Sequence, residues 1–202
     1  GIDKKDGVGV CEVFLTPSIS LQEIIQNGKH QNLDLLLSNI KDLLAEQTVN
    51  KIAADYYHFS QWLEQNASSN YEFIIIDAPA STSPISINAM LAADLIIVPL
   101  ECEALAIKSL KRFLQAFKEL QKNIEPGLRL AGILLTMYDD EILSHQQVCR
   151  QIYQTLGDSV FETIIPNCPY ILEASSMGID VIQRHLNSEG ATGYIRLANE
   201  LL

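Results

Sequence analysis

The sequence predicts an α/β protein built on a doubly wound, mostly parallel sheet with helices on both faces. Short, wholly apolar runs rich in β-branched residues recur along the chain, which is the pattern of strands covered on both faces. Patterns typical of helices lie between these runs, and such alternation indicates a parallel sheet with right-handed crossovers. The chain has 202 residues, of which 48% are hydrophobic, and no repeat or Pro/Gly/Ser linker divides it. We therefore expect one domain over residues 1–202 with a sizeable core.

Four apolar runs are expected as the main strands, and a fifth run is a weaker candidate. Each of the four ends at a residue that would lie at the carboxyl edge of the sheet, where open parallel sheets bind their ligands. The expected strands are 73–76 before Asp77, 95–98 before Pro99, 130–135 before Thr136 and 160–165 before Pro166, with 33–37 as the weaker candidate.

Helix signals mark the segments between these strands. Ser20-x-x-Glu23 and Ser144-x-x-Gln147 fit the capping box, in which side chains satisfy the free N–H groups of a first turn. The clearest helix is expected over residues 104–122, because apolar residues recur there at spacings of three and four. Its basic side chains fall on one face, which we interpret as solvated because Glu119 lies among them; they are Lys108, Lys111, Arg112, Lys118 and Lys122.

Composition and charge exclude several classes of protein. The net charge is −11, which argues against nucleic acid as the default partner. The apolar runs are shorter than the roughly 20 residues that a membrane span needs, and no signal-peptide pattern opens the chain. The four cysteines and four histidines have no metal-type spacing. We therefore expect reduced thiols and a cytoplasmic protein without a zinc site.

Asp77 is the main candidate for chemistry. It follows four apolar residues, so it is expected at the mouth of a buried strand. A carboxylate there can hold a magnesium-bound water or orient an attacking one. Taken alone, the pattern also fits an aspartate that merely caps the next turn, and both interpretations remain open at this point.

Several segments in order along the chain resemble the ParA family of deviant Walker ATPases. They are 77–81, 87–103, 132–139 and 190–202, while 1–6, 19–21 and 32–36 resemble the family's segment after switch I. The resemblance covers essentially the whole chain. It implies a P-loop NTPase-like fold and an ATP-dependent homodimerising switch that partitions plasmids or chromosomes with a ParB-type partner. It also implies that Asp77 is the Walker B carboxylate, reaching Mg²⁺ through water, and that Pro166 and Asn167 lie near the adenine of ATP.

The family's phosphate loop, KGGxGKT[ST], does not occur in these residues. Gly7-Val8-Gly9 lacks the Lys-Thr pair, and Gly28-Lys29 lacks the hydroxyl residue that follows the lysine in the family. We expect that an N-terminal strand–helix–strand unit of roughly 30 or more residues is missing. The chain alone is then expected not to hydrolyse ATP, so no catalytic residue is assigned. An exposed sheet edge also predicts poor solubility or oligomerisation.

The positions at which many relatives carry DNA-binding arginines are occupied here by Glu141, Asn167 and Tyr170. Since phosphate neutralisation supplies most non-specific affinity, we expect weakened binding to DNA, with nucleoid association only if that binding persists. The helix over 194–202 carries one Arg and one Glu and lacks the basic amphipathic character of a membrane anchor.

Three hypotheses follow from these observations. In the first hypothesis, the chain is part of a partition ATPase whose phosphate loop lies upstream. In the second, it is an ATPase-deficient ParA-like regulatory or binding protein, and in the third it is a gene remnant. Gly1 in place of Met favours the first or third hypothesis, and the altered arginine positions favour the second or third.

Overall fold

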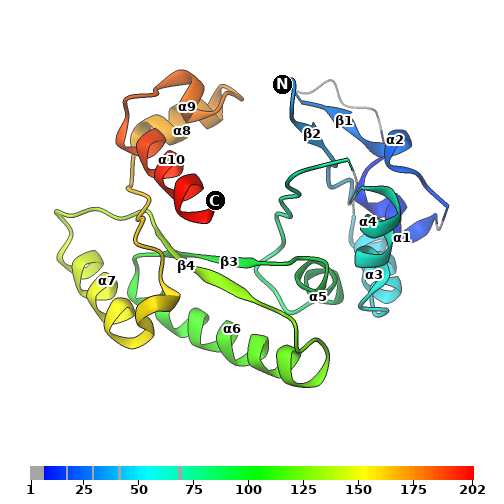
Figure 1. Ribbon diagram of the computed structural model, residues 1–202, viewed down its shortest axis with the longest axis horizontal. Coiled ribbons are helices and arrows are strands. Elements are labelled where there is room, and N and C mark those ends of the chain that lie inside the picture. The colour runs from blue at the N-terminus through cyan, green and yellow to red at the C-terminus, as the bar shows by residue number, and fades with distance from the viewer. Residues whose placement is uncertain (1–6, 17, 29, 41, 68–69) are drawn as a thin grey trace. The chain divides into compact units, whose positions relative to one another are not determined.

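The computed structural model divides the chain into two compact units with separate cores, Gly1–Asp94 and Leu95–Leu202. Figure 1 shows the secondary structure of both units. The residues that the structure describes are 7–16, 18–28, 30–40, 42–67 and 70–202.

The first unit is mainly helical. Its α1 packs against α3 and α4, and α5 packs against the same two helices. The core contains Phe59 and Trp62 of α4, together with Val13, Ile24 and Val49, which are fully buried. The elements are α1 (Val10–Leu15), α2 (Leu21–Ile24), β1 (Gln26–Asn27), β2 (Asp34–Leu35), α3 (Leu43–Ile52), α4 (His58–Asn66) and α5 (Pro84–Leu91).

The capping box at Ser20 is confirmed. The Glu23 carboxylate accepts hydrogen bonds from the Ser20 hydroxyl at 2.6 Å and from its N–H at 2.9 Å. These hydrogen bonds lower the pKa of Glu23. The weaker strand candidate at 33–37 is confirmed in part, since only β2 forms there and it pairs antiparallel with β1.

The strand expected over 73–76 does not form in the described structure. These residues make no backbone hydrogen bond to another described residue. Since a β-strand is defined by backbone hydrogen bonds to a neighbouring strand, the segment is not a strand. Phe73 and Ile75 are 62% and 93% exposed. The segment therefore has the apolar composition of a buried strand without the partner that would bury it.

The second unit contains a two-stranded parallel sheet, which is part of the sheet that the sequence predicts, and the strand expected over 160–165 is present only as isolated bridges. Strand β3 pairs parallel with β4, from Ile97 opposite Gly132 to Glu101 opposite Thr136. Residues 160–166 run parallel along the other edge of β4, where the Phe161 and Ile165 N–H groups donate to the carbonyls of Ile133 and Leu135. Among the described residues, this unit contains β3 (Ile96–Glu101), α6 (Ala104–Asn123), β4 (Leu130–Thr136), α7 (Leu143–Leu156), a 3₁₀ turn (Gly157–Ser159), α8 (Pro169–Ser176), α9 (Val181–Arg184) and α10 (Glu189–Leu201).

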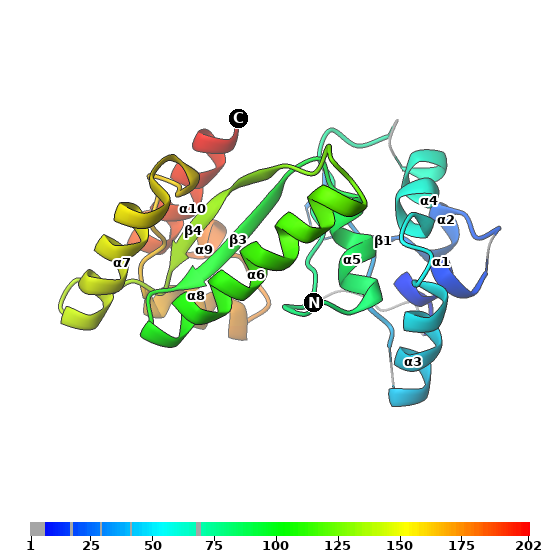
Figure 2. The same cartoon turned by 90° about the horizontal axis from the view of Figure 1, so that it is seen from below.

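Helices cover both faces of β4. Ile133 and Leu135 point to one face, where they pack with residues of α6 and α7. Leu134 points to the other face and packs with Phe161 and Ile165, against which residues of α8 and α10 also lie. Figure 2 shows α6 and α7 beside the two strands. Ile133, Leu134 and Leu135 point to alternate faces because successive side chains of a strand lie on opposite sides of the sheet.

The helix expected over 104–122 is confirmed as α6, with Leu110 and Phe117 buried on its apolar stripe. The capping box at Ser144 is wrong. Helix α7 begins at Leu143 with Ile142 as its N-cap, two residues earlier than the capping box predicts. The preceding loop is instead held by hydrogen bonds between residues six positions apart. Gln146 donates to the Asp140 carbonyl at 2.6 Å, and His145 Nδ1 accepts from the Asp139 N–H.

Candidate functional site

A cavity of about 400 Å³ lies at the carboxyl end of β4 and of the 160–166 segment. This is the edge at which the sequence predicts a ligand site. The sheet side of the cavity is formed by Tyr138, Ile164 and Pro166. The helix side comes from the start of α10 and the residues before it, namely Asn187, Glu189, Thr192, Gly193 and Arg196.

Backbone hydrogen bonds fix the sheet side of the cavity. The chain turns at Met137 directly after β4, where φ is +54°, a value that non-glycine residues seldom adopt. The Tyr138 N–H then donates to the Ile165 carbonyl at 3.2 Å, and the Asn167 N–H donates to the Tyr138 carbonyl at 2.7 Å. Tyr138 and Pro166 are therefore held side by side at the edge of the sheet.

Helix α10 is packed closely against this edge by its glycines. A Cβ atom on Gly193 would lie 3.3 Å from the side chains of Ile165 and Pro166, and one on Gly190 would lie 2.7 Å from Ile171. Since a glycine has no side chain, the helix backbone can approach the edge of the sheet at Gly193 and helix α8 at Gly190. The Ser188 hydroxyl caps the helix by accepting from the Ala191 N–H.

The far end of α10 is attached to the same segment through Glu200. Its carboxylate accepts from the N–H groups of Glu162 at 2.7 Å and Thr163 at 2.9 Å. Partial burial acts to raise the pKa of Glu200, but the hydrogen bonds from Thr163 and Glu162 outweigh it, so the pKa lies below its ordinary value. The helix side of the cavity is thus fixed at both ends of α10.

The residues of α10 in the cavity offer charged and polar groups. Thr192 and Gly193 lie three and four residues after Glu189 and four and three residues before Arg196, so the four residues share one face of α10. Burial raises the pKa of the Tyr138 phenol, with smaller contributions from Cys149 and Asp140, so Tyr138 is neutral at physiological pH.

The three site residues predicted from the sequence lie in different surroundings. Pro166 lines the cavity, whereas the neighbouring Asn167 is exposed and contributes its backbone N–H to the edge of the sheet. Asp77 belongs to the first unit and is exposed. Its carboxylate makes no hydrogen bond or ion pair to another residue in the part of the chain that the structure describes.

A group of serine hydroxyls follows Asp77 at the start of α5. The Ser81 Oγ lies 2.9 Å from the Ser83 Oγ and 2.8 Å from the Ser86 Oγ. Ser86 is buried, and its hydroxyl donates to the Pro79 carbonyl at 3.2 Å, as does the Ser81 N–H at 2.7 Å. These contacts fix the turn at Pro79, two residues after Asp77.

The α10 residues of the cavity were not found from the sequence. The spacing of Glu189, Thr192, Gly193 and Arg196 fits one helical face, but nothing in that spacing indicates that the face borders a cavity. The close packing at Gly190 and Gly193 places this face of α10 beside the cavity. The sequence shows the two glycines but not what they pack against.

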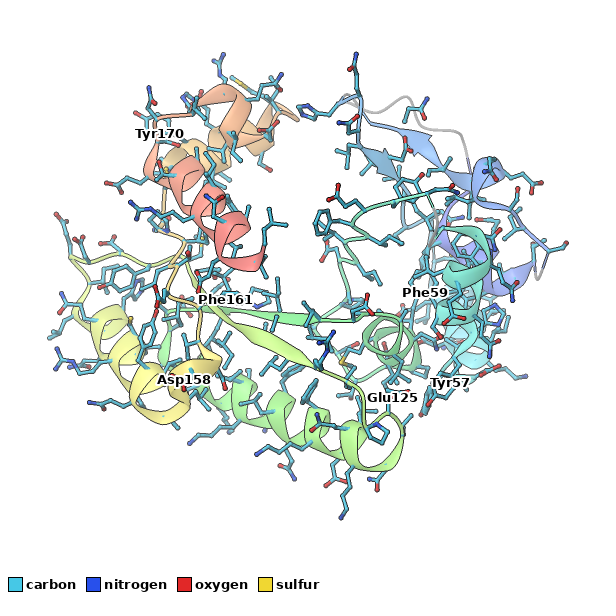
Figure 3. All side chains as sticks on the ribbon, viewed as in Figure 1. Tyr57, Phe59, Glu125, Asp158, Phe161 and Tyr170 are labelled. Carbon is cyan, nitrogen blue, oxygen red and sulfur yellow. The ribbon has the colours of Figure 1, made fainter. Side chains whose placement is uncertain are left out.

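Other sequence expectations concern surface residues and thiols. Glu141, Asn167 and Tyr170, which occupy the positions of the family's arginines, are exposed. Tyr170 lies on α8 (Figure 3), and its ring centroid is 4.5 Å from that of His185. The five basic residues of α6 are also exposed. Cys102 is buried, and burial, followed by the neighbouring Cys149, raises its pKa to about 11. Within the described ranges, no group of His, Cys, Asp and Glu could hold a metal ion, and no helix has the length and apolarity to cross a membrane.

Comparison with known proteins identifies the family. Residues 1–130 match the AAA domain family AAA_31. The chain is 39% identical over 132 residues to the chromosome-partitioning ATPase Soj of Thermus thermophilus, covering 65% of this chain and 53% of that protein. It is 31% identical over 201 residues to the sporulation initiation inhibitor protein Soj of Bacillus subtilis, covering 100% of this chain and 79% of that protein. The alignment thus spans about half of the first relative and four fifths of the second.

Solved structures share the fold. Cobyrinic acid a,c-diamide synthase of Mycobacterium smegmatis, with bound ADP and magnesium, superposes with a TM-score of 0.76 at 26% identity, over 96% of this chain and 71% of that one. The septum site-determining protein MinD of Pyrococcus horikoshii, complexed with Mg-ADP, gives a TM-score of 0.74 at 20% identity, over 98% of this chain and 75% of that one. The chain therefore belongs to the ParA/Soj/MinD family of deviant Walker ATPases, as its sequence motifs predict.

Proposed function

We propose that this chain works as part of a ParA/Soj-type partitioning ATPase, an ATP-dependent dimerising switch in plasmid or chromosome segregation. In this proposal residues 1–202 form one doubly wound domain that acts in the cytoplasm with a second copy and a ParB-type partner. The observation that carries it is the cavity at the carboxyl edge of a parallel sheet, in a chain that is a member of this family. Open α/β sheets bind their nucleotides at this edge.

The cavity is the proposed site of the adenine base. It is roomy enough for a purine at about 400 Å³, and Pro166 and Ile164 supply apolar side chains for a base to contact. Asn167 closes the neighbouring turn through its N–H. ATP bound here would supply the phosphoryl group whose presence or absence sets the state of the switch.

Asp77 is proposed to act on Mg²⁺ through a coordinated water. Its carboxylate has no competing hydrogen bond or ion pair among the described residues, and a hard oxygen ligand suits this cation. The serine hydroxyls around Pro79 would keep the turn after Asp77 in one conformation. Asp77 would thereby hold the metal at a defined place without being a base in the reaction.

The base site is tested by filling the cavity. Thr192 lines it from α10, so Thr192→Trp should abolish binding of adenosine to the 202-residue chain, as measured by equilibrium dialysis. Asn199→Trp places the same side chain on an exposed position of the same helix outside the cavity and should leave binding unchanged. Equal adenosine binding by both variants and the wild-type chain would refute the assignment.

A second candidate function is favoured by the sequence itself. These 202 residues contain no Gly-Lys-Ser or Gly-Lys-Thr, so a phosphate loop is not among them. An ATPase-deficient regulatory protein would use the same fold to bind a full-length relative and change its turnover. Adding the chain to an active ParA-type ATPase and measuring phosphate release distinguishes the two: a stoichiometric change in turnover supports the regulator.

The DNA partner is proposed to bind weakly. The positions that carry arginines in many relatives hold Glu141, Asn167 and Tyr170 here, and the chain carries a net charge of −11. The exposed basic face of α6 offers some compensation, although Glu119 reduces its charge. Non-specific affinity depends on neutralised phosphates, so this balance favours low affinity.

A further inference from the structure

A stripe of basic side chains on α6 faces away from the sheet, and we call it the basic face of α6. Leu110 and Phe117 are buried on the opposite side of the helix, so the stripe points to solvent. At 1.5 Å per residue it extends about 21 Å along the helix. Its side chains are exposed and lie within about a third of the helix circumference; they are Lys108, Lys111, Arg112, Lys118 and Lys122.

The charges of the basic face are not neutralised by the residues that the structure describes. No hydrogen bond or ion pair joins these five side chains to another described residue. Glu119 is the one acidic residue of α6, and its carboxylate accepts a hydrogen bond from Asn123 Nδ2 at 3.3 Å. With five basic residues and one acidic residue, α6 carries a charge of +4 in a chain whose net charge is −11. The face is therefore a positive region on an acidic protein, and it attracts a negative surface.

Negative charge gathers at the carboxyl edge of the sheet in the same unit. Strands β3 and β4 end in register, with Glu101 opposite Thr136, so the residues that follow both strands leave the sheet at one edge. No Lys or Arg occurs in residues 99–107 or 136–149. Four exposed carboxylates in these two segments make no hydrogen bond or ion pair to another described residue, and we call them the acidic edge; they belong to Glu101, Glu103, Asp140 and Glu141.

A surface of each sign on one unit is complementary to a second copy of the same chain. Charge complementarity of this kind determines which surfaces of two proteins meet. Nucleic acid is a poorer match, because a phosphate chain laid along α6 toward its first residue, Ala104, would approach the carboxylates of Glu101 and Glu103. A second copy has no such conflict, since it offers carboxylates to the basic face and basic side chains to the acidic edge.

We propose that the basic face of α6 binds the acidic edge of a second copy of this chain. The two surfaces differ, so the contact is heterologous. It goes beyond the proposed function, whose dimer depends on ATP, because this contact depends on charge and requires no nucleotide. Exposed ion pairs are screened by salt. The association should therefore weaken between 0.1 M and 1 M NaCl, as the Debye length falls from about 10 Å to about 3 Å.

The test reverses the charges of each surface and then mixes the two variants. Lys111→Glu with Arg112→Glu reverses the basic face, and Asp140→Lys with Glu141→Lys reverses the acidic edge. Every chain also carries Ile75→Ser, which removes an exposed apolar side chain of the first unit without adding charge. Sedimentation velocity in 0.1 M NaCl without nucleotide measures the association.

Each reversed variant alone should associate at least about 10-fold more weakly than the parent chain, because its two surfaces now have the same sign. A 1:1 mixture of the two variants should recover the association, since each surface again meets one of opposite sign. Both variants keep a net negative charge, so attraction between them cannot come from their total charges.

Lys51→Glu with Arg150→Glu is the matched control. Both residues are exposed and lie outside the two surfaces, so this variant makes the same change in charge and should associate like the parent chain. Far-ultraviolet circular dichroism verifies that each variant keeps its helices. A parent chain that stays monomeric in 0.1 M NaCl overturns the inference, as does a mixture that associates no more strongly than its components. Reversal of the basic face that lowers affinity for duplex DNA but leaves self-association unchanged also overturns it, because the face would then bind nucleic acid.

Discussion

The amide of Asn88 links α5 to the start of α4 and to the turn before it in the first unit. Asn88 lies on α5 and is fully buried. Its Oδ1 accepts from the Phe59 N–H at 3.1 Å, and its Nδ2 donates to the carbonyls of Ala53 at 2.6 Å and of Asp55 and Pro84 at 3.2 Å. Helix α4 has no side-chain cap of its own, so Asn88 satisfies a first-turn N–H of α4 from 29 residues away.

Asn88→Ala should destabilise this unit by about 3 kcal/mol. The variant loses one accepted hydrogen bond and the two that the Nδ2 hydrogens can make at once, each worth about 1 kcal/mol net. The Phe59 N–H would also be left buried without a partner, which adds to the cost and rules out a small effect. The cavity left by the missing amide acts in the same direction.

Urea unfolding followed by the fluorescence of Trp62 measures this effect. Trp62 is the single tryptophan of the chain, and it is buried in the core of the first unit. With a slope of about 1.5 kcal/mol per molar urea, the midpoint should fall by about 2 M. Asn66→Ala is the control, because Asn66 makes one hydrogen bond, to the Trp62 carbonyl within the same helix. If the two variants shift the midpoint equally, the capping argument for Asn88 is refuted.

Four further outcomes follow from the same structure. Glu200→Gln should reduce stability to urea at pH 7 by about 1 kcal/mol. Because the native pKa of Glu200 lies below the unfolded value of about 4.3, that difference should disappear as pH falls below about 4, as circular dichroism can measure, and a pH-independent difference would contradict it. Cys102, with its pKa near 11, should resist iodoacetamide at pH 8 until the chain is unfolded in urea, and rapid labelling of the native chain would show that it is accessible. Ile75→Lys should increase the monomer fraction in size-exclusion chromatography with light scattering, since the exposed apolar run at 73–76 is expected to drive association. A wild-type chain that is already monomeric would contradict association through this run. Duplex DNA should bind weakly in fluorescence polarisation at 0.15 M salt, and nanomolar affinity would contradict the argument from Glu141, Asn167 and Tyr170.

The sequence predicted the second unit better than the first. The apolar runs at 95–98 and 130–135 form the parallel pair β3–β4, and the helix expected over 104–122 is α6. These elements are specified locally, because β-branched runs and the three-and-four spacing each fit one regular structure. The 73–76 run has the same local signature but no strand forms, since pairing depends on a neighbour that local sequence does not supply.

The sequence by itself determined the family, the α/β class and the position of Pro166 at the carboxyl edge of the sheet, where the structure has a cavity. Each depends on residue types in a fixed order along the chain. Only the tertiary structure decided that α10 forms the second wall of the cavity, that Glu200 is held by backbone N–H groups and not by Arg196, and that Asn88 caps α4. These features depend on contacts between residues that are far apart in sequence, and their hydrogen bonds and packing are set by how the elements dock.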